Sequence, residues 1–239
     1  MRVAIVADIH GNKIALDAVL QDLAQQPSID QIVIAGDLCL NGPQPRPVLE
    51  TVWQMHCPVI QGNADTEVVT EQSQRGHKKQ SMADWVSEQI GSDGVHYLAN
   101  LPFSYLVSNP QGSQGRDLLV VHANPLNQDG SIYPSTPDSE LEPFFSSLPS
   151  NIGAVIFGHH HVAYQRRWRH LLLVDTGSCG LPRDKDLRAS YAILTWQNNA
   201  WKAEHRRIPY DVATVIRQIE ESDMPNKKKR IKVLTEAKY

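Results

Sequence analysis

The first apolar run of the chain reads VAIVADIHGN over residues 3–12. Its short β-branched part predicts a buried strand over residues 2–7. Asp8 and His10 follow, where the apolar run gives way to polar residues. Residues two apart point to the same side of a strand, so both side chains would face one way if the strand geometry persisted. A carboxylate and an imidazole at a strand end indicate a metal site.

The same arrangement, an apolar run that ends in polar residues, recurs further along the chain. The later runs are IVIAGD (32–37), VIQGN (59–63), LLVVH (118–122) and AVIFGHHH (154–161). With the first run they supply Asp8, His10, Asp37, Asn63, His122, His159 and His161. These are too many ligands for one ion, and they suit two. Alternation in the last run predicts that His160 faces away from the metals, or toward a substrate.

The order of the apolar runs predicts an α/β fold that begins with a parallel sheet. Strands are expected over 2–7, 31–35 and 58–61, with one helix capped by Asn12 and another over 48–56 between them. Residues 64–100 are expected to be mainly helical, and their polar part, 72–80, is expected to form a loop.

The second half of the chain is expected to be rich in strands. The predicted strands cover 103–108, 117–121, 152–157, 163–168, 171–175, 189–196 and 200–207, with turns at 112–115 and 198–199 and a helix near 138–147. An amphipathic helix is predicted over 211–222. The charge pattern of KKKRIK at 227–232 favours a solvated tail over a nucleic-acid contact.

Composition describes an ordinary globular protein. With 239 residues, 41% hydrophobic and 21% charged, the chain has enough material for one full core. We therefore expect a single domain over 1–239, with a C-terminal helix and a basic tail from about 211. The net charge of −3 provides no overall field that would draw the protein onto nucleic acid.

Cysteine usage and apolar run lengths predict a cytoplasmic protein. Cys39, Cys57 and Cys179 are odd in number and widely spaced, as expected of reduced thiols. No apolar run approaches membrane-spanning length, and VAIVA is too short for the apolar core of a signal peptide. No membrane partner is expected, and a homo-oligomer is left open.

The blocks D-x-H, G-D, G-N, H and G-H-x-H occur in a fixed order, and together they resemble the calcineurin-like metallophosphoesterase superfamily from Asp8 to about Arg188. The stretches GDLCLNGPQPRPVLE (36–50) and DTGSCGLPRDKDLRASYAIL (175–194) resemble its small bacterial and archaeal phosphodiesterase-like branch. The resemblance implies a four-layer αββα sandwich, in which two mixed β-sheets are flanked by helices.

The resemblance also implies roles for individual residues. Asp37 would bridge two divalent ions. Asp8, His10 and His161 would complete one site, and Asn63, His122 and His159 the other. Mixed imidazole and oxygen ligands suit Mn, Fe, Zn or Ni, with Mn expected to work in vitro. Two such ions would hydrolyse a phosphoester through a metal-bound hydroxide, with Asp37, Asn63 and Asp65 as the expected catalytic residues. Asp65 is expected to orient a ligand, or alternatively to cap a helix.

Several further polar residues are substrate-binding candidates. They are Asn41, His160, Ser178, Arg183 and Arg188, with Asn124 and Tyr133 in neighbouring segments. Arginine suits bidentate contact with phosphate. Taken singly, each of these residues is more often a structural or surface residue than a ligand contact.

Ala64 marks a departure from the family pattern, because many members carry a histidine there that is thought to assist the leaving group. Without a proton donor, poor leaving groups should react slowly, since general-acid help contributes about 10²–10⁴ in rate. We therefore expect action on phosphodiesters, nucleotides or dinucleoside polyphosphates.

Two alternatives remain open. A protein serine/threonine phosphatase would be expected to keep the missing histidine at Ala64. A metal-binding scaffold without activity would be expected to lose ligands, and all seven are present. A nuclease is disfavoured, because the sequence indicates no basic groove or added capping domain.

Overall fold

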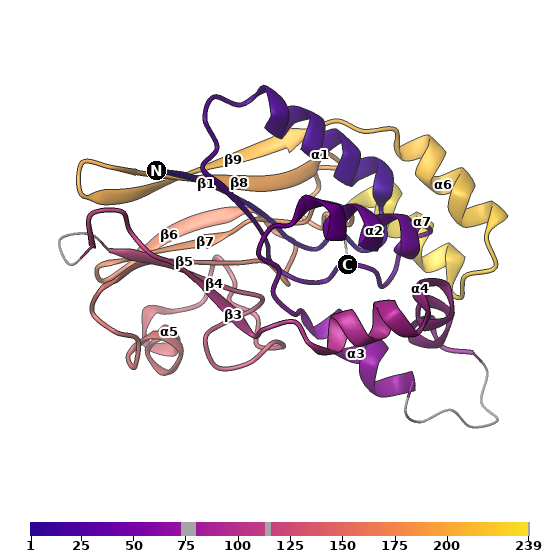
Figure 1. The fold of residues 1–239 in the computed structure, drawn as a ribbon, viewed down its shortest axis with the longest axis horizontal. Helices are drawn as coiled ribbons and strands as arrows, with labels where there is room; N and C mark the ends of the chain where they lie inside the picture. Colours follow the sequence, from indigo (N-terminus) through magenta and orange to yellow (C-terminus); the bar gives the residue numbers. More distant parts are fainter. Residues whose placement is uncertain (73–79, 113–115, 239) are drawn as a thin grey trace.

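The computed structural model describes residues 1–72, 80–112 and 116–238, and within them the strands form two mixed sheets (Figure 1). The first sheet has the order β2-β1-β8-β9 and the second has the order β3-β4-β5-β7-β6. The strands are β1 (Arg2–Val6), β2 (Gln31–Ile34), β3 (Ser104–Val107), β4 (Asp117–Val121), β5 (Ile152–Phe157), β6 (Tyr164–Trp168), β7 (Leu171–Asp175), β8 (Ala189–Gln197) and β9 (Ala200–Ile208). Parallel pairs join β1 to β2, and β4 to β5 to β7, while the other neighbours are antiparallel.

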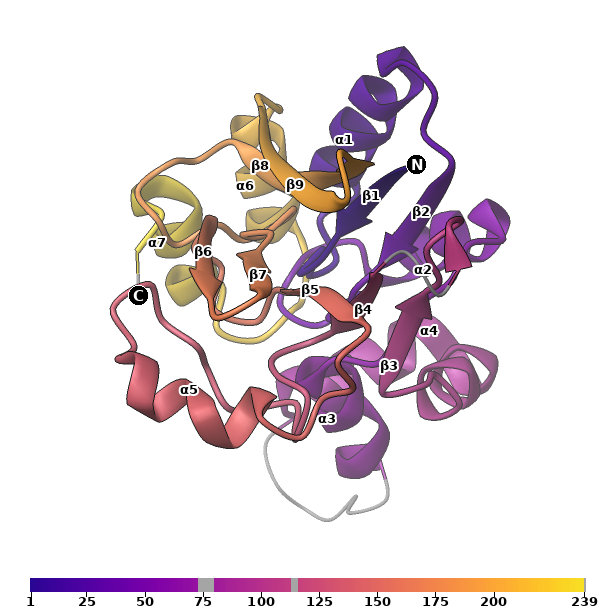
Figure 2. The same cartoon turned by 90° about the vertical axis from the view of Figure 1, so that its left-hand side faces the viewer.

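Helices cover the outer faces of both sheets. They are α1 (Lys13–Gln25), α2 (Pro45–Met55), α3 (Asn63–Gln72), α4 (Met82–Ala99), α5 (Asp138–Phe145), α6 (Val212–Glu221) and α7 (Lys227–Glu236). In Figure 1, α1 lies above the first sheet, α6 lies to its right and α5 lies below the second sheet, and Figure 2 shows the two sheets after a turn of 90°.

Three separate apolar cores account for the four layers. Alternate residues of β1 face opposite ways: Ala4 and Val6 pack against the helices, and Val3 and Ile5 pack against the second sheet. On the far side of the second sheet, α5 contributes Leu141 and Phe145 to a third core with β4, β5 and β7. The fold is therefore the αββα sandwich that the sequence predicts.

Two predicted elements differ in their extent. Residues 58–61 do not form a strand, because the pairing is a single bridge between Val59 and Ile34. Pro58 has no N–H to extend the ladder, and beyond the bridge Gln61 N donates to Pro102 O instead. The helix expected over 48–56 begins earlier, at Pro45, because proline is well suited to a first helical turn. The predicted loop at 72–80 and turn at 112–115 lie mostly outside the described residues.

The basic C-terminal stretch is a packed helix, not a solvated tail. Val233 and Leu234 of α7 are buried in the helix-side core, and Ile231 packs against it. The backbone of Ala237 accepts a hydrogen bond from Lys185 N at 2.9 Å. Apolar residues at helical spacing thus dock the helix despite its charge. In the described parts of the chain, no helix is both long and apolar enough to cross a membrane.

Candidate metal centre

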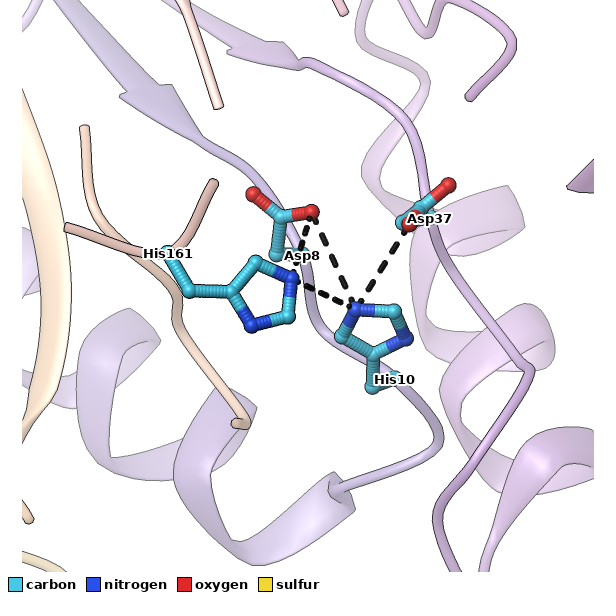
Figure 3. A group of neighbouring side chains, drawn as sticks. All are labelled: Asp8, His10, Asp37 and His161. Carbon is cyan, nitrogen blue, oxygen red and sulfur yellow. Dashed lines mark hydrogen bonds and ion pairs between the residues drawn. The ribbon is translucent and has the colours of Figure 1, made fainter. Parts of the chain in front are cut away.

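Side chains from three separate segments meet at the carboxyl ends of the central strands. Figure 3 shows Asp8, His10, Asp37 and His161, whose potential ligand atoms all lie within 4.8 Å of one another. Asp8 and His10 follow β1, Asp37 follows β2, and His161 follows β5. All four side chains are almost fully buried. The arrangement brings residues that are up to 153 positions apart, 8 and 161, into one cluster.

The backbone at these residues is left-handed and not extended. Positive φ angles occur at Asp8 (55°), His10 (48°), Asp37 (57°), His159 (68°) and His161 (63°). Because β1 ends at Val6, the strand does not continue through Asp8 and His10. Strand alternation, the geometry considered from the sequence, therefore does not set the directions of these side chains. Hydrogen bonds between the two strand-end loops hold the turns, including His10 N to Asp37 O at 2.9 Å.

The histidine hydrogen bonds identify which ring nitrogens are available as ligands. His10 Nδ1 lies 2.8 Å from Leu40 O, and His161 Nδ1 lies 2.6 Å from Leu181 O. A carbonyl only accepts hydrogen bonds, so each Nδ1 must carry the proton. The two Nε2 lone pairs then face each other at 3.0 Å. Such a contact is repulsive unless a cation lies beside it, and backbone-anchored Nδ1 atoms are usual for metal-binding histidines.

The carboxylate of Asp8 supports the same conclusion. Its Oδ2 accepts a hydrogen bond from His159 N at 2.9 Å. Its Oδ1 is buried without a hydrogen-bond partner among the described residues, 3.2 Å from His161 Nε2. A buried carboxylate oxygen beside unprotonated imidazole nitrogens is suited to a divalent ion. The residues present therefore fit a metal.

A second gathering of ligand-type atoms adjoins the first. Asn63 Oδ1 lies 3.0 Å from His122 Nε2 and 2.9 Å from His159 Nδ1. His122 Nδ1 is anchored on Ala35 O at 2.9 Å, so its Nε2 is the ring nitrogen that faces Asn63 and Asp37. Asp37 lies between the two groups, with Oδ2 3.5 Å from His10 Nε2 and Oδ1 3.3 Å from His122 Nε2.

Burial acts to lower the pKa of His122, but the carboxylates of Asp37 and Asp8 outweigh it and raise the pKa above its ordinary value. Burial raises the pKa of Asp37 to about 8, and the nearby carboxylates of Asp8 and Asp65 add to the effect against the opposing His122. Burial lowers the pKa of His10 well below its ordinary value, so this imidazole is neutral, as a ligand must be. A bound cation would lower the pKa of the Asp37 carboxyl group and keep it ionised.

Asp65 holds the loops that carry the candidate ligands. Its Oδ2 accepts hydrogen bonds from Asp37 N and Gly62 N, and its Oδ1 accepts one from Leu38 N, all at 2.9 Å. Both oxygens are thus turned to backbone amides, which is consistent with the expectation that Asp65 orients a ligand. A Cβ on Gly62 would come within 2.2 Å of Asp37 Oδ1, so this close approach of the two loops requires glycine.

A small pocket of about 130 Å³ opens onto the cluster. Its lining includes the predicted residues Asn41 and Arg183, together with Ala64, Asn63, His10, Asp37, His159 and His161. Leu40 and Glu67 also line it, and sequence analysis did not single them out. Glu67 follows Asn63 by one helical turn on α3, so helical spacing was the signal that could have identified it.

Other predicted substrate contacts lie elsewhere. Ser178 is fully buried, donates to Asp8 O and accepts from Leu181 N, so it fixes a loop and cannot reach a substrate. Arg188 is exposed and pairs with Asp186. Asn124 organises its own turn by accepting from the backbone amides of Leu126 and Asn127.

His160 lies outside the pocket lining and packs against Tyr133. The two ring centroids are 4.1 Å apart and the rings stand at 79° to each other. This placement agrees with the expectation that His160 turns away from its two neighbours, which both line the pocket.

A larger groove of the described structure lies away from the cluster. It measures about 460 Å³ and is lined by β6, β7 and β9, including Arg166, Arg167 and Lys202. These residues lie at the opposite end of the strands, because Lys202 pairs with Thr195, which in turn pairs with Arg2 at the start of β1. Convergent ligand chemistry, and not volume, therefore locates the candidate site.

Comparisons with known proteins agree with the fold. Residues 1–199 match the family model of the calcineurin-like phosphoesterase superfamily domain. An uncharacterised protein of Methanocaldococcus jannaschii is 27% identical over 241 residues, which cover 93% of each chain.

Two solved structures share the architecture over nearly their whole length. A metallophosphoesterase from Sphaerobacter thermophilus is 24% identical, with a TM-score of 0.80 over 99% of this chain and 100% of that one. A hypothetical protein from Pyrococcus horikoshii OT3 is 21% identical, with a TM-score of 0.85 over 100% and 99%. Because the family model spans most of the sequence, the chain belongs to the calcineurin-like phosphoesterase superfamily.

Proposed function

We propose that the protein is a dinuclear metal-dependent phosphoesterase. The observation that carries this proposal is the position of the Asp37 carboxylate, with one oxygen facing His10 and the other facing His122. A carboxylate can use both oxygens as ligands, so this orientation suits a bridge between two ions. We assign Asp8, His10 and His161 to one ion, and Asn63, His122 and His159 to the other.

Two divalent ions, when bound, would supply a nucleophile at neutral pH and stabilise charge on the phosphate. The chain's own residues position them. The backbone carbonyls of Leu40, Ala35 and Leu181 fix the ring orientations, and Asp65 fixes the loops of Asp37 and Asn63. Arg183 lines the pocket and would contact the phosphate.

The substrate is proposed to be a phosphodiester or a phosphoanhydride of a nucleotide. At about 130 Å³ the pocket is smaller than the roughly 300–1,000 Å³ that hold drug-sized ligands, so it suits a phosphoryl group, with the rest of the substrate outside. Ala64 lines this pocket and brings no proton donor. Asp65 does not replace this proton donor, because both of its carboxylate oxygens accept hydrogen bonds from backbone amides. A leaving group that needs little protonation is therefore favoured.

Substrate comparison tests this specificity. With Mn added, kcat/KM for bis(p-nitrophenyl) phosphate should exceed that for an alkyl phosphomonoester. Ala64→His should raise the monoester value selectively, by up to about 10²-fold if the imidazole reaches the leaving oxygen. Equal efficiency of the parent on both substrates would remove Ala64 as the determinant of specificity.

Metal content separates an enzyme from an inactive scaffold. Freshly purified protein should contain close to two transition-metal ions per chain, as measured by elemental analysis. A chain with one ion would contradict the dinuclear assignment, and a chain with none that stays inactive after Mn is added would favour a scaffold.

The described structure records Cys39, Cys57 and Cys179 as free thiols, which supports the proposal of a reducing, cytoplasmic location.

A further inference from the structure

The basic stretch of α7 is not uniform, because one of its cations points inward. Lys228, Lys229 and Lys232 are exposed, whereas Arg230 is only partly accessible. Arg230 precedes the buried Val233 and Leu234 by three and four residues, so it lies on the face of α7 that packs against the protein. Its Nε is buried and has no hydrogen-bond partner within the described ranges. A buried guanidinium nitrogen without a partner is costly, so this position needs a reason.

The neighbours of Arg230 belong to the pocket at the metal centre. Arg230 interacts electrostatically with Arg183 and Glu67, which both line that pocket. Burial lowers the pKa of Arg230, and the charge of Arg183 lowers it further, whereas Glu67 opposes the change. Arginine nevertheless remains charged. Arg230 is thus close enough to the guanidinium of Arg183 and the carboxylate of Glu67 to interact with both charges.

One loop connects this pair to the candidate ligands. His161 Nδ1 is anchored on Leu181 O, and Arg183 N donates to His161 O at 3.1 Å. Two residues later, Lys185 N donates to Ala237 O at the end of α7. The loop from 181 to 185 therefore joins the metal-ligand cluster to the helix that carries Arg230, and it places Arg183 between the two.

We propose that Arg183 and Arg230 form an anion-binding pair that holds a second phosphate of the substrate while the scissile phosphoryl group lies at the metal centre. This inference rests on the proposed function. A bound anion would neutralise the two positive charges of Arg183 and Arg230. Each guanidinium group can also donate two parallel hydrogen bonds to phosphate oxygens. The substrate class is then a phosphoanhydride with two or more phosphates, such as a nucleoside or dinucleoside polyphosphate. An aryl diester has no second anionic group and would not use Arg230.

The test compares Arg230→Gln with Lys229→Gln, which removes an exposed charge from the same helix. With Mn-loaded protein, Arg230→Gln should lower kcat/KM for a dinucleoside tetraphosphate about tenfold or more, mainly through KM. It should leave bis(p-nitrophenyl) phosphate almost unchanged. Lys229→Gln should alter neither. Arg230→Lys should restore only part of the loss, because lysine keeps the charge without the fork.

A binding measurement on metal-free protein gives a readout besides activity. Calorimetric titration with inorganic pyrophosphate should show binding to the parent and to Lys229→Gln, and roughly tenfold weaker binding to Arg230→Gln. If Arg230→Gln does not fold, as judged by its thermal unfolding, Arg230→Lys provides the same comparison.

The outcomes separate this inference from the proposed function. Unchanged polyphosphate kinetics in Arg230→Gln, equal losses on both substrates, or absence of pyrophosphate binding to the parent would each overturn the anion pair. A parent that hydrolyses neither substrate, yet binds pyrophosphate through Arg230, would instead overturn the phosphoesterase proposal and leave the anion site standing.

Discussion

At the scale of single residues, the Asp37 carboxylate lies between the two groups of candidate ligands. One oxygen accepts a hydrogen bond from Ala64 N at 2.8 Å and lies near His122, while the other lies near His10. Its main-chain N–H is held by Asp65. A change at this side chain therefore affects both groups of candidate ligands.

Asp37→Asn should remove nearly all activity and lower metal occupancy at both positions. An amide has one oxygen to offer where the carboxylate has two, and the loss should exceed the roughly 10–100-fold caused by removing an outer partner of a metal ligand. Activity on bis(p-nitrophenyl) phosphate and elemental analysis measure the two effects. Asp17→Asn, on the exposed side of α1, is the matched control. Near-normal turnover with two ions bound would eliminate the bridge.

The three consecutive histidines should respond differently to replacement. His159→Ala and His161→Ala should each lose about 100-fold or more in activity, because both side chains point into the candidate site. His160→Ala should keep most activity and lose roughly 0.5–1.5 kcal/mol of stability with the Tyr133 contact. Thermal unfolding of all three variants checks that each is folded. If folded His160→Ala lost as much activity as His159→Ala and His161→Ala, the His160 ring would have a role in substrate binding.

At the scale of elements, a polar clamp joins α1 to the first sheet. Asp22 accepts a hydrogen bond from Tyr191 Oη at 2.5 Å, and Arg206 binds both of its oxygens. Tyr191 is fully buried on β8, and Arg206 lies opposite it on β9. Burial acts to raise the pKa of Asp22, but the hydrogen bonds from Arg206 and Tyr191 outweigh it, and the pKa lies below its ordinary value.

The clamp predicts a pH-dependent contribution to stability. A carboxyl group with a lowered folded-state pKa stabilises the protein above its unfolded value near 3.9, and the contribution is lost as pH falls through the folded value. Asp22→Asn should therefore lower the denaturation midpoint at pH 7, and the difference from the parent should shrink below about pH 4. Urea unfolding at several pH values measures this difference in denaturation midpoint, with Asp17→Asn as the control. A difference that is constant from pH 7 to pH 3 would exclude ionisation of Asp22 as its source.

The element boundaries show what sequence patterns can predict. Apolar β-branched runs identified β1, β2, β4 and β5, because buried parallel strands need such residues on both faces. The same runs predicted that ligand-type residues gather, since the carboxyl ends of parallel strands share an edge. The docking of α7 was not predicted, because KKKRIK is dominated by charge while its anchors, Val233 and Leu234, follow it. The structural role of Ser178 leaves no pattern in the neighbouring sequence either.

At the scale of the whole molecule, the candidate metal centre joins the two sheets. Asp8 and Asp37 follow strands of the first sheet, whereas His122, His159 and His161 follow strands of the second. Ions held by both sets would link sheets that otherwise meet through an apolar core. Metal binding should therefore stabilise the entire fold and not one loop.

Removal of metal should lower the melting temperature as a single transition. An ion at about 100 times its dissociation constant adds roughly 2.7 kcal/mol. At about 2–4 °C per kcal/mol for a chain of this size, the chelated protein should melt about 5–10 °C lower, and Mn should restore it. His161→Ala should lose most of this response. An unchanged melting temperature after complete removal of the ions would show that they do not connect the sheets.

The left-handed backbone at Asp8, His10, Asp37, His159 and His161 restricts how this centre can be redesigned. Outside glycine, asparagine, aspartate and histidine are the residues that tolerate this conformation best. Exchanging a ligand for cysteine or glutamate would change the metal preference, but it would also strain the main chain. This backbone strain would cost about 1–3 kcal/mol at each position. Mutant libraries at these five positions should yield active variants almost entirely among Asn, Asp and His, whichever metal is used for selection.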